Sequence, residues 1–523
     1  MTKVDLQQLL IAASRAYHER RLPDAEAAAT KVLELQPGEP RAAELMGHIR
    51  LDNGRYEDAI AYFKTALEAA PDNAALMSLI GTAYASDKKL KSAIIYFQQA
   101  VQAAPDNMLA WENLGKVAYQ LRRWSHARAA FEHCLLLDDK NDEAASGLAR
   151  LEFREGQYNR AMDLASDVIA RNPGHLMSRQ VMADANLRLG HFEQALAGAL
   201  AIAEEARAAP KTKVLAYGIA AEAAQGLNRY DDAFAYFTAM NQAVADAYRR
   251  GYERAQKRGG YRKLRELIEI TPKLPEKTKD WSTESGSPPA IYYIGFVSSG
   301  MSTFTKIINR HPQVVSGAKR NDIPFWQEIV WDDDAPGRIA ALTLEDIERL
   351  RREFRVACDE ADIELREGQV VFDNRPFYTR HLATLAMVLP NARYLLAHRD
   401  PRDVVLNCFL HRSSPNVSMY EFLDIETTAN YYDVSMGAAI AARDAFGLDM
   451  LELGYDQLWA DPEGETRRVL KHFGLPWNKA LLSEDGTLLG GETKAPSIWR
   501  NYEAHLAPVM PLLDKWVTRF GYD

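Results

Sequence analysis

Small and apolar residues recur in the first half of the chain with a period of 34 residues. Six successive units carry an alanine at the same place: Ala25, Ala59, Ala93, Ala127, Ala161 and Ala195. Phenylalanines and prolines keep the same register: Phe63, Phe97, Phe131, Pro37, Pro71, Pro105 and Pro173. A repeat of this length predicts one antiparallel helix pair per unit, stacked on its neighbours as a solenoid.

Glycines at a second fixed position, Gly47, Gly81 and Gly115, let the first helix of a pair approach its neighbour closely. The segment RYDDAFAYF, residues 229–237, indicates a seventh unit that is shifted by four residues. The pattern resembles the tetratricopeptide repeat (TPR) over about residues 5–245. The resemblance implies a concave groove that holds a peptide or a partner protein. A spacer or a dimerisation arm is the alternative, because fold alone does not specify function.

Residues 271–290, TPKLPEKTKDWSTESGSPPA, interrupt the helical pattern. The segment is rich in proline, serine and charge and has no periodicity, which is typical of a linker. We therefore predict an α-solenoid over residues 1–270, a linker over 271–290 and a second domain over 291–523.

From Ile291 onward, apolar runs rich in β-formers alternate with helical patterns. Four runs have the length of buried strands: IYYIGFV (291–297), VVFDNRP (370–376), ARYLLAH (392–398) and LELGYDQL (451–458). Strands that alternate with helices predict an α/β domain with a parallel central sheet. The last run precedes a helix with Asp461 as its N-cap and Pro462 in its first turn.

The loop SSGMS, residues 298–302, joins the first of these strands to an amphipathic helix. N–H groups at a helix start lack carbonyl partners and the helix dipole is positive there, so phosphate or sulfate binds at such a site. The loop is not a Walker A motif, since no Gly-Lys-Ser/Thr follows the glycine. A tight turn in which the glycine serves only packing is the alternative. The candidate anion-binding residues of the loop are Ser298, Ser299, Gly300 and Ser302.

Polar residues also follow the third apolar run, at the point where the predicted strand leads into a helix. Arg399 and Asn407 stand eight positions apart across this turn. A guanidinium and an amide in that arrangement donate hydrogen bonds to one anionic group. The carboxyl ends of parallel strands form the edge where open sheets bind ligands. Arg399 and Asn407 are therefore further candidates for an anion site.

Composition narrows the classes of function. A net charge of −9 argues against binding to nucleic acid, whose affinity depends on lysine and arginine. The three cysteines have no paired spacing, which excludes a disulfide framework and a thiolate zinc site. The chain has neither a run of eighteen apolar residues nor the apolar core of a signal peptide at its start. We expect a cytoplasmic protein without a membrane span.

The second half resembles bacterial sulfotransferases fused to TPRs, which are relatives of the tyrosylprotein sulfotransferases. The most specific motifs are HRDPRDVVLNCF (398–409) and ADPEGETRRVLKHFGLPW (460–477). The resemblance implies a TPR α-solenoid followed by a P-loop-like α/β sulfotransferase domain. It also implies metal-independent transfer of a sulfuryl group from 3′-phosphoadenosine 5′-phosphosulfate (PAPS) to a hydroxyl or an amine. Ser299, Gly300 and Ser302 match the family's loop, and Arg399 matches the arginine that holds the 3′-phosphate.

The chain departs from the family pattern at positions that carry charge. Ser298 and Asn374 stand where basic residues are expected, Lys319 replaces the catalytic glutamate, and Asn407 replaces a serine. A lysine is a poor base unless its pKa is strongly depressed. We therefore expect Lys319 to stabilise the leaving phosphate. Three residues remain as candidates for the base: Asp322, Glu328 and His411.

Two interpretations follow. The first is a PAPS-dependent sulfotransferase whose TPRs recruit a protein or a bulky small-molecule acceptor. The second is a catalytically degenerate scaffold that keeps the sulfotransferase fold and binds a partner protein through its TPRs. A nucleotide phosphotransferase is disfavoured, because the Walker lysine and a recognisable Walker B site are absent from the sequence.

Overall fold

The chain divides into two compact units, Met1–Ile202 (unit 1) and Ala203–Asp523 (unit 2). The computed structural model describes the following residues: 3–205, 208–257, 260–278, 289–317, 335–361, 363, 365–376, 378–412 and 417–523. The boundary between the two units thus lies after Ile202, well before the segment 271–290. The role of that segment as a domain linker stays a prediction.

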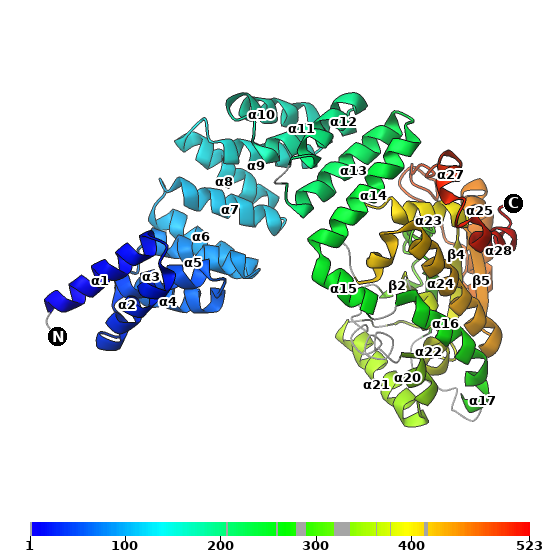
Figure 1. Cartoon of the computed structure of the whole chain (residues 1–523). Coiled ribbons are helices and arrows are strands. Elements are labelled where there is room, and N and C mark those ends of the chain that lie inside the picture. Colours follow the sequence, from blue (N-terminus) through cyan, green and yellow to red (C-terminus); the bar gives the residue numbers. More distant parts are fainter. Residues whose placement is uncertain are drawn as a thin grey trace. The chain divides into compact units, whose positions relative to one another are not determined.

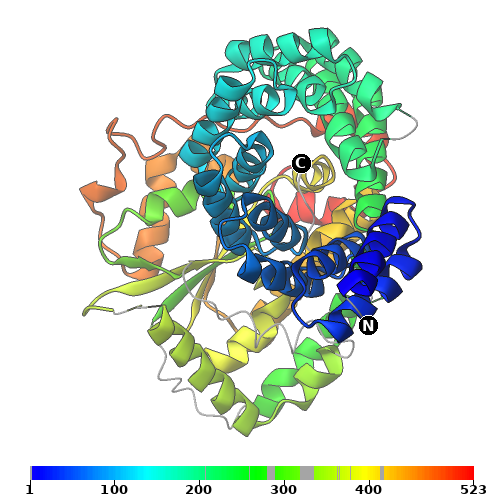
Figure 2. The same ribbon diagram turned by 90° about the vertical axis from the view of Figure 1, so that its left-hand side faces the viewer.

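Unit 1 is built from antiparallel helix pairs that stack one on the next (Figures 1 and 2). Its helices are α1 (Lys3–His18), α2 (Leu22–Leu35), α3 (Pro40–Asp52), α4 (Tyr56–Ala69), α5 (Ala74–Ser86), α6 (Leu90–Ala103), α7 (Met108–Gln120), α8 (Trp124–Leu137), α9 (Asp142–Arg154), α10 (Tyr158–Arg171), α11 (Leu176–Arg188) and α12 (Phe192–Ala203). The described residues before 240 contain no strand, in agreement with the predicted helical solenoid.

The repeated glycines and phenylalanines pack directly on one another. A Cβ atom built on Gly47 would lie 2.5 Å from the Phe63 ring, and one on Gly81 would lie 2.8 Å from the Phe97 ring. The six repeated alanines are fully buried between helices. Any larger side chain at these positions would push the helices apart, so close packing accounts for the small residues.

Helix ends repeat with the same period as the core. The first helices of five pairs begin at residues whose side chains accept a backbone N–H: Glu39, Asn73, Asn107, Asn141 and His175. The turn inside each pair has one residue with positive φ: Arg20, Gly54, Lys88, Arg122, Gly156 and Gly190. Each cap satisfies an N–H that the helix itself leaves unpaired.

We expect Lys88→Gly to raise the stability of the protein by about 0.5–1 kcal/mol, because a side chain at positive φ is strained and glycine is not. Lys88 is exposed and has φ 63°, and Gly156 occupies the matching turn with φ 80° and no atom within 4 Å of the place where a Cβ would stand. Denaturant unfolding measures the difference. Gly156→Ala is the control and has to shift stability in the opposite direction; equal shifts would contradict the strain argument.

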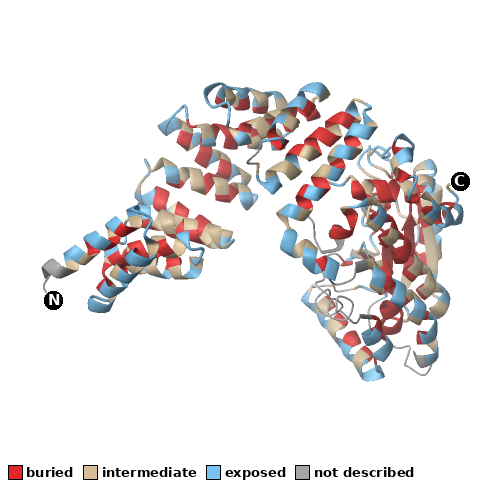
Figure 3. Ribbon diagram, in the orientation of Figure 1, coloured by how far each residue is buried: buried red, intermediate tan, exposed pale blue. Residues whose placement is uncertain are grey.

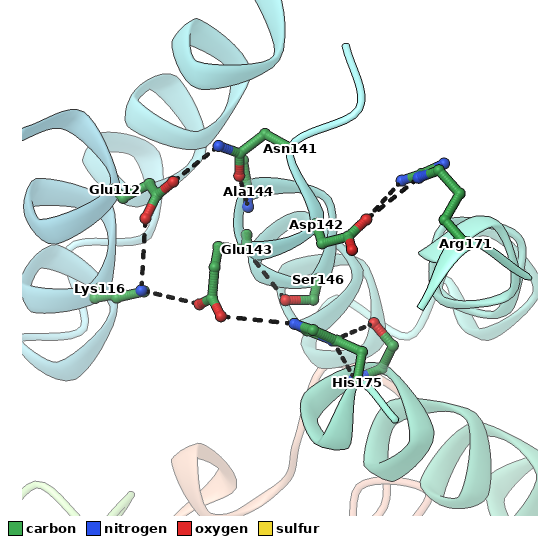
Figure 4. A network of polar contacts seen from close by, with 10 residues as sticks. Glu112, Lys116, Asn141, Asp142, Glu143, Ala144, Ser146, Arg171 and His175 are labelled. Carbon is green, nitrogen blue, oxygen red and sulfur yellow. Dashed lines mark hydrogen bonds and ion pairs between the residues drawn. The ribbon is translucent and has the colours of Figure 1, made fainter. Parts of the chain in front are cut away.

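Polar side chains link three successive first helices of unit 1 (Figure 4). Lys116 on α7 lies 2.9 Å from Glu143 on α9, and Glu143 lies 3.6 Å from Nε2 of His175 at the start of α11. The Asn141 amide donates to Glu112 at 2.8 Å. The hydrogen bond from Lys116 lowers the pKa of Glu143, so this carboxylate stays ionised and holds neighbouring repeats together.

Unit 2 contains a five-stranded parallel sheet in the order β2-β3-β1-β4-β5. Its strands are β1 (Ala290–Gly295), β2 (Val314–Ser316), β3 (Val370–Asn374), β4 (Arg393–His398) and β5 (Met450–Gly454). The parallel sheet and four of its strands confirm the prediction. The short strand β2 was not predicted, because three residues show no periodicity.

Helices cover both faces of this sheet. The helices of unit 2 are α13 (Pro210–Gly226), α14 (Tyr230–Ala247), α15 (Arg249–Lys257), α16 (Gly260–Ile270), α17 (Leu274–Thr278), α18 (Met301–Ile308), α20 (Ala335–Ala341), α21 (Leu344–Glu360), α22 (Leu382–Val388), α23 (Pro401–Phe409), α24 (Ile425–Phe446), α25 (Tyr455–Ala460), α26 (Pro462–Phe473), α27 (Glu503–Leu506) and α28 (Met510–Phe520). Helices α18 and α26 pack on one face of the sheet, and α22, α23, α24 and α28 belong to the core on the other. Within unit 2, Figure 3 shows buried residues in the sheet and in the helices beside it.

The seventh helix pair, α13 and α14, belongs to unit 2. Asn241 on α14 donates to the carbonyl of Phe409 at 3.1 Å, and the Phe234 ring stacks on the Phe409 ring with centroids 4.9 Å apart. Phe237 and Met240 lie in the same buried cluster as the sheet. The last repeat pair is therefore part of the α/β core.

No helix of the described residues is long and apolar enough to cross a membrane.

Candidate functional site

The connections after β1 and β4 leave the sheet in opposite directions. β1 leads into α18 on one face, whereas β4 leads into α23 on the other, and the two strands are parallel neighbours. A crevice forms at such a switch point, outside the carboxyl ends of the strands. Strand order thus places the two predicted anion-binding segments beside each other.

A pocket of about 850 Å³ lies at this point. The six predicted anion-binding residues all line it: Ser298, Ser299, Gly300, Ser302, Arg399 and Asn407. Its other lining residues include Lys306, Asn374, His411, Tyr455 and Glu492. Residues from separate parts of the sequence therefore converge on one cavity of a size typical of ligand sites.

The loop after β1 is held in an unusual backbone conformation. Ser298 has φ 68° and Gly300 has φ 81°, and the N–H of Ser299 donates to the carbonyl of Phe296 at 3.2 Å. Burial raises the pKa of the Cys408 thiol to about 12, so the thiol is protonated and donates to the carbonyl of Val297 at 3.5 Å. These two hydrogen bonds hold the loop in this conformation.

Position 300 requires glycine for two reasons: its φ is positive, and there is no space for a Cβ atom. A Cβ at this position would lie 2.1 Å from Cδ2 of Tyr455. Gly300 is also the N-cap of α18, and no side chain caps that helix start. The N–H of Thr303 donates to the carbonyl of Gly300 at 3.3 Å, so the N–H groups of Met301 and Ser302 are the ones at this helix start that suit an anion in the pocket.

Arg399 directly follows β4, is buried with 6% of its surface exposed, and lines the pocket. Its Nη2 donates to the carbonyl of Pro496 at 3.0 Å and lies 3.7 Å from Asp403. Its guanidinium carbon lies 4.8 Å from the centroid of the Tyr455 ring. Within the part of the chain that the structure describes, Nε and Nη1 of Arg399 make no hydrogen bond. Both groups remain as donors to an anion.

Two neutral polar side chains and a histidine complete the polar wall. Asn407 and His411 come from α23 and the turn after it, and Asn374 lies at the end of β3. The Asn374 amide donates to Oγ1 of Thr305 at 2.6 Å. Burial lowers the pKa of His398 to about 4, so this imidazole is neutral and adds no second cation next to Arg399.

The two predicted catalytic residues, Lys319 and Asp322, lie outside the described residues, as does the alternative base Glu328. Their roles stay predictions. His411 is the one candidate base within the described part of the chain, and it lines the pocket.

Sequence reasoning missed several lining residues, among them Lys306, Tyr455 and Glu492. Lys306 stands four residues after Ser302. This helical spacing puts both side chains on one face of the helix, so the sequence could have indicated that Lys306 lines the same site. Tyr455 directly follows β5, at the sheet edge where ligands bind. Glu492 lies in an irregular segment, and no local pattern connects it with this pocket.

The family model described as "Sulfotransferase family" matches residues 289–479. The model for the tetratricopeptide repeat matches residues 44–108, and the one for anaphase-promoting complex, cyclosome, subunit 3 matches residues 135–202. The matches fall on the parallel sheet and on the stacked helix pairs.

Curated relatives point to the same family at low identity. The chain is 24% identical over 249 residues to protein-tyrosine sulfotransferase 1 of Danio rerio, covering 45% of this chain and 67% of that protein. It is 24% identical over 242 residues to protein-tyrosine sulfotransferase A of Caenorhabditis elegans, covering 44% of this chain and 61% of the relative. Part of each relative's length therefore lies outside the match.

Among solved structures, a tetratricopeptide repeat protein from Parabacteroides merdae has a TM-score of 0.39 at 18% identity and covers 46% of this chain and 93% of that one. The family matches and the observed sheet agree with the resemblance found in the sequence. The chain therefore contains TPRs and, after them, a sulfotransferase-family domain over residues 289–479.

Proposed function

We propose that the protein transfers a sulfuryl group from PAPS to a hydroxyl or an amine of a protein or bulky small-molecule acceptor. One observation carries this proposal: the six residues expected to bind the nucleotide line one pocket at the switch point of a sulfotransferase-family domain. These residues come from two separate segments of the chain, 298–302 and 399–407, which follow the neighbouring strands β1 and β4.

The pocket residues suit the two charged ends of such a nucleotide. The buried guanidinium of Arg399, with Nε and Nη1 as donors, fits the 3′-phosphate, and the Asn407 amide fits beside it. The uncapped start of α18 with Ser302 fits the 5′ end, where N–H groups and a hydroxyl meet the anion.

The transfer requires charge stabilisation and a base. The acceptor oxygen or nitrogen forms a bond to sulfur, while the bond from sulfur to the 5′-phosphate oxygen breaks and its electron pair stays on the phosphate. The α18 N–H groups and Lys319 are proposed to stabilise that phosphate. The acceptor proton goes to Asp322, or to His411, whose imidazole lines the pocket.

The TPRs are proposed to recruit the acceptor as a protein or peptide. Solenoids of stacked helix pairs present an extended surface for such partners. Labelled PAPS, incubated with the full chain and a panel of peptides and small hydroxyl compounds, tests the transfer. Sulfated product supports the proposal, and an inert protein across the panel contradicts it.

Nucleotide binding is tested separately with 3′-phosphoadenosine 5′-phosphate (PAP). Calorimetry should show binding by the wild type and a loss of about ten- to a hundredfold in affinity for Arg399→Ala, because a charge-assisted contact is removed. Arg399→Lys keeps the charge but loses the planar fork, so its affinity should lie between the two. Arg500→Ala removes an exposed arginine outside the pocket and is the matched control. Equal affinity of the wild type and Arg399→Ala would refute the assignment.

A catalytically degenerate scaffold is the second candidate. It is favoured by two neutral residues in the pocket, Ser298 and Asn374, where the family resemblance implies cations. A scaffold of this kind binds PAP or nothing and transfers no sulfate. Ser298→Arg combined with Lys319→Glu restores the family pattern, and activity that appears only in this double variant would establish the scaffold interpretation.

A further inference from the structure

Lys306 is a cation that lines the pocket, and the family resemblance gives it no role. It lies on α18 four residues after Ser302, and both side chains line the pocket. Side chains of an α-helix lean toward its N-terminus, so Lys306 reaches back toward the loop at the start of α18. Its position suits contact with an anion held at that helix start.

Glu492 is the partner of this lysine. Nζ of Lys306 and Oε1 of Glu492 form an ion pair, and Glu492 itself lines the pocket. The side chains are 61% and 28% exposed, so the pair lies at the mouth of the cavity and not in its depth. A carboxylate thus borders a pocket whose other charged residues suit an anion.

The segment that carries Glu492 is anchored on its far side. The N–H of Ala495 donates to Oη of Tyr455 at 2.8 Å, and Arg399 donates to the carbonyl of Pro496. On the near side, Gly490 has φ 61° and Gly491 has φ 72°. The N–H of Glu492 itself donates to the carbonyl of Leu489 at 3.2 Å, so the backbone is held on both sides and the Glu492 carboxylate can leave Lys306 by rotation of its side chain.

The charges around the pocket indicate a role for the ion pair between Lys306 and Glu492. The loop lacks a cation at Ser298, and Asn374 is neutral, so the pocket needs positive charge from elsewhere near the 5′ end. A carboxylate so close to a bound phosphate would repel it unless it moved away or stayed paired. An incoming phosphate and Glu492 therefore compete for the same ammonium group.

We propose that Lys306 binds the 5′-phosphate end of the nucleotide and that Glu492 is the counter-ion which the nucleotide displaces. The inference rests on the proposed function and deepens it, because it names the cation that replaces the one missing from the loop. Lys306 is then a binding residue, and Glu492 sets the affinity of the empty pocket for an anion.

Calorimetry on the full chain with PAP tests the competition. Glu492→Gln should tighten PAP binding and Lys306→Ala should weaken it, each by about fivefold at low salt, the scale of a partly exposed charge pair. Both effects should shrink as salt rises, because exposed charges are screened. In Lys306→Ala, the further change Glu492→Gln should have a smaller effect than in the wild type.

A second probe locates the contact. Adenosine 3′-monophosphate lacks the 5′-phosphate, so its affinity should be the same in the wild type, Lys306→Ala and Glu492→Gln. Glu463→Gln breaks an exposed ion pair with Arg467 on α26, outside the pocket, and should leave PAP affinity unchanged.

The outcomes separate this inference from the proposed function. PAP binding by the wild type with no change in Lys306→Ala and Glu492→Gln overturns the inference alone. Equal effects on PAP and on adenosine 3′-monophosphate also overturn it, because the contact would not involve the 5′ end. Absence of PAP binding in the wild type and in Glu492→Gln overturns both.

Discussion

A fragment of residues 289–523 is expected not to fold, whereas a fragment of residues 203–523 is expected to fold cooperatively. The shorter fragment retains the whole segment that matches the sulfotransferase family. It lacks α13 to α17. Phe237 and Met240 of α14 are 2% and 1% exposed, and Leu264 and Leu267 of α16 are 6% and 4% exposed, within the core that includes the sheet. Loss of each such side chain costs about 2–5 kcal/mol, and the whole domain is stabilised by only about 5–15 kcal/mol.

Polar contacts add to this loss. Without α14, the carbonyl of Phe409 loses the amide of Asn241, and without α13, Oη of Tyr502 loses Oε1 of Gln225 at 2.9 Å. Thermal melting followed by circular dichroism compares the two fragments. A cooperative transition of the 289–523 fragment at the temperature of the longer one would show that α13 to α17, the seventh pair included, are dispensable. The same comparison tests the domain boundary predicted at residues 271–290.

Gly300→Ala is expected to lower PAP affinity by about a hundredfold. The new Cβ would be held at φ 81° and would overlap Tyr455, so the loop or the ring has to move, and both line the pocket. A left-handed non-glycine residue costs about 1–2 kcal/mol and a steric overlap about 1–3 kcal/mol more, which together correspond to a change of this size. Calorimetry with PAP measures the effect.

Gly474→Ala is the matched control for the cost of the backbone angle. Gly474 has φ 69° and ends α26, and no atom lies within 4 Å of the place where its Cβ would stand. This variant should lose about 1 kcal/mol of stability from the backbone angle alone and keep its PAP affinity. If Gly300→Ala binds PAP as tightly as the wild type, the loop after β1 is not the anion site.

The repeats were predictable from sequence because their geometry is local. Each pair depends on residues within one 34-residue period, such as Gly47 against Phe63, so the pattern of small and aromatic residues records the packing directly. The helix with Asp461 as N-cap was predictable for the same reason, since the Asp461 carboxylate accepts the N–H of Gly464, three residues away.

The candidate site was predictable in part. Ser298, Gly300 and Arg399 follow strands, and the rule for parallel sheets brings strand ends to one edge. Tyr455 and Glu492 were missed. Glu492 lies 186 residues from its partner Lys306, and no periodicity in the sequence relates positions so far apart. The roles of Lys319 and Asp322 remain predictions.

By itself, the sequence determined the helical repeats, the parallel sheet and the position of the two candidate anion-binding segments at strand ends, because each depends on neighbouring residues and on general rules of chain connection. Tertiary structure alone decided three other features: the assignment of α13 and α14 to unit 2, the packing of Gly300 against Tyr455, and the pairing of Lys306 with Glu492. These features depend on contacts between segments distant in sequence, and such contacts arise only when the whole core has packed.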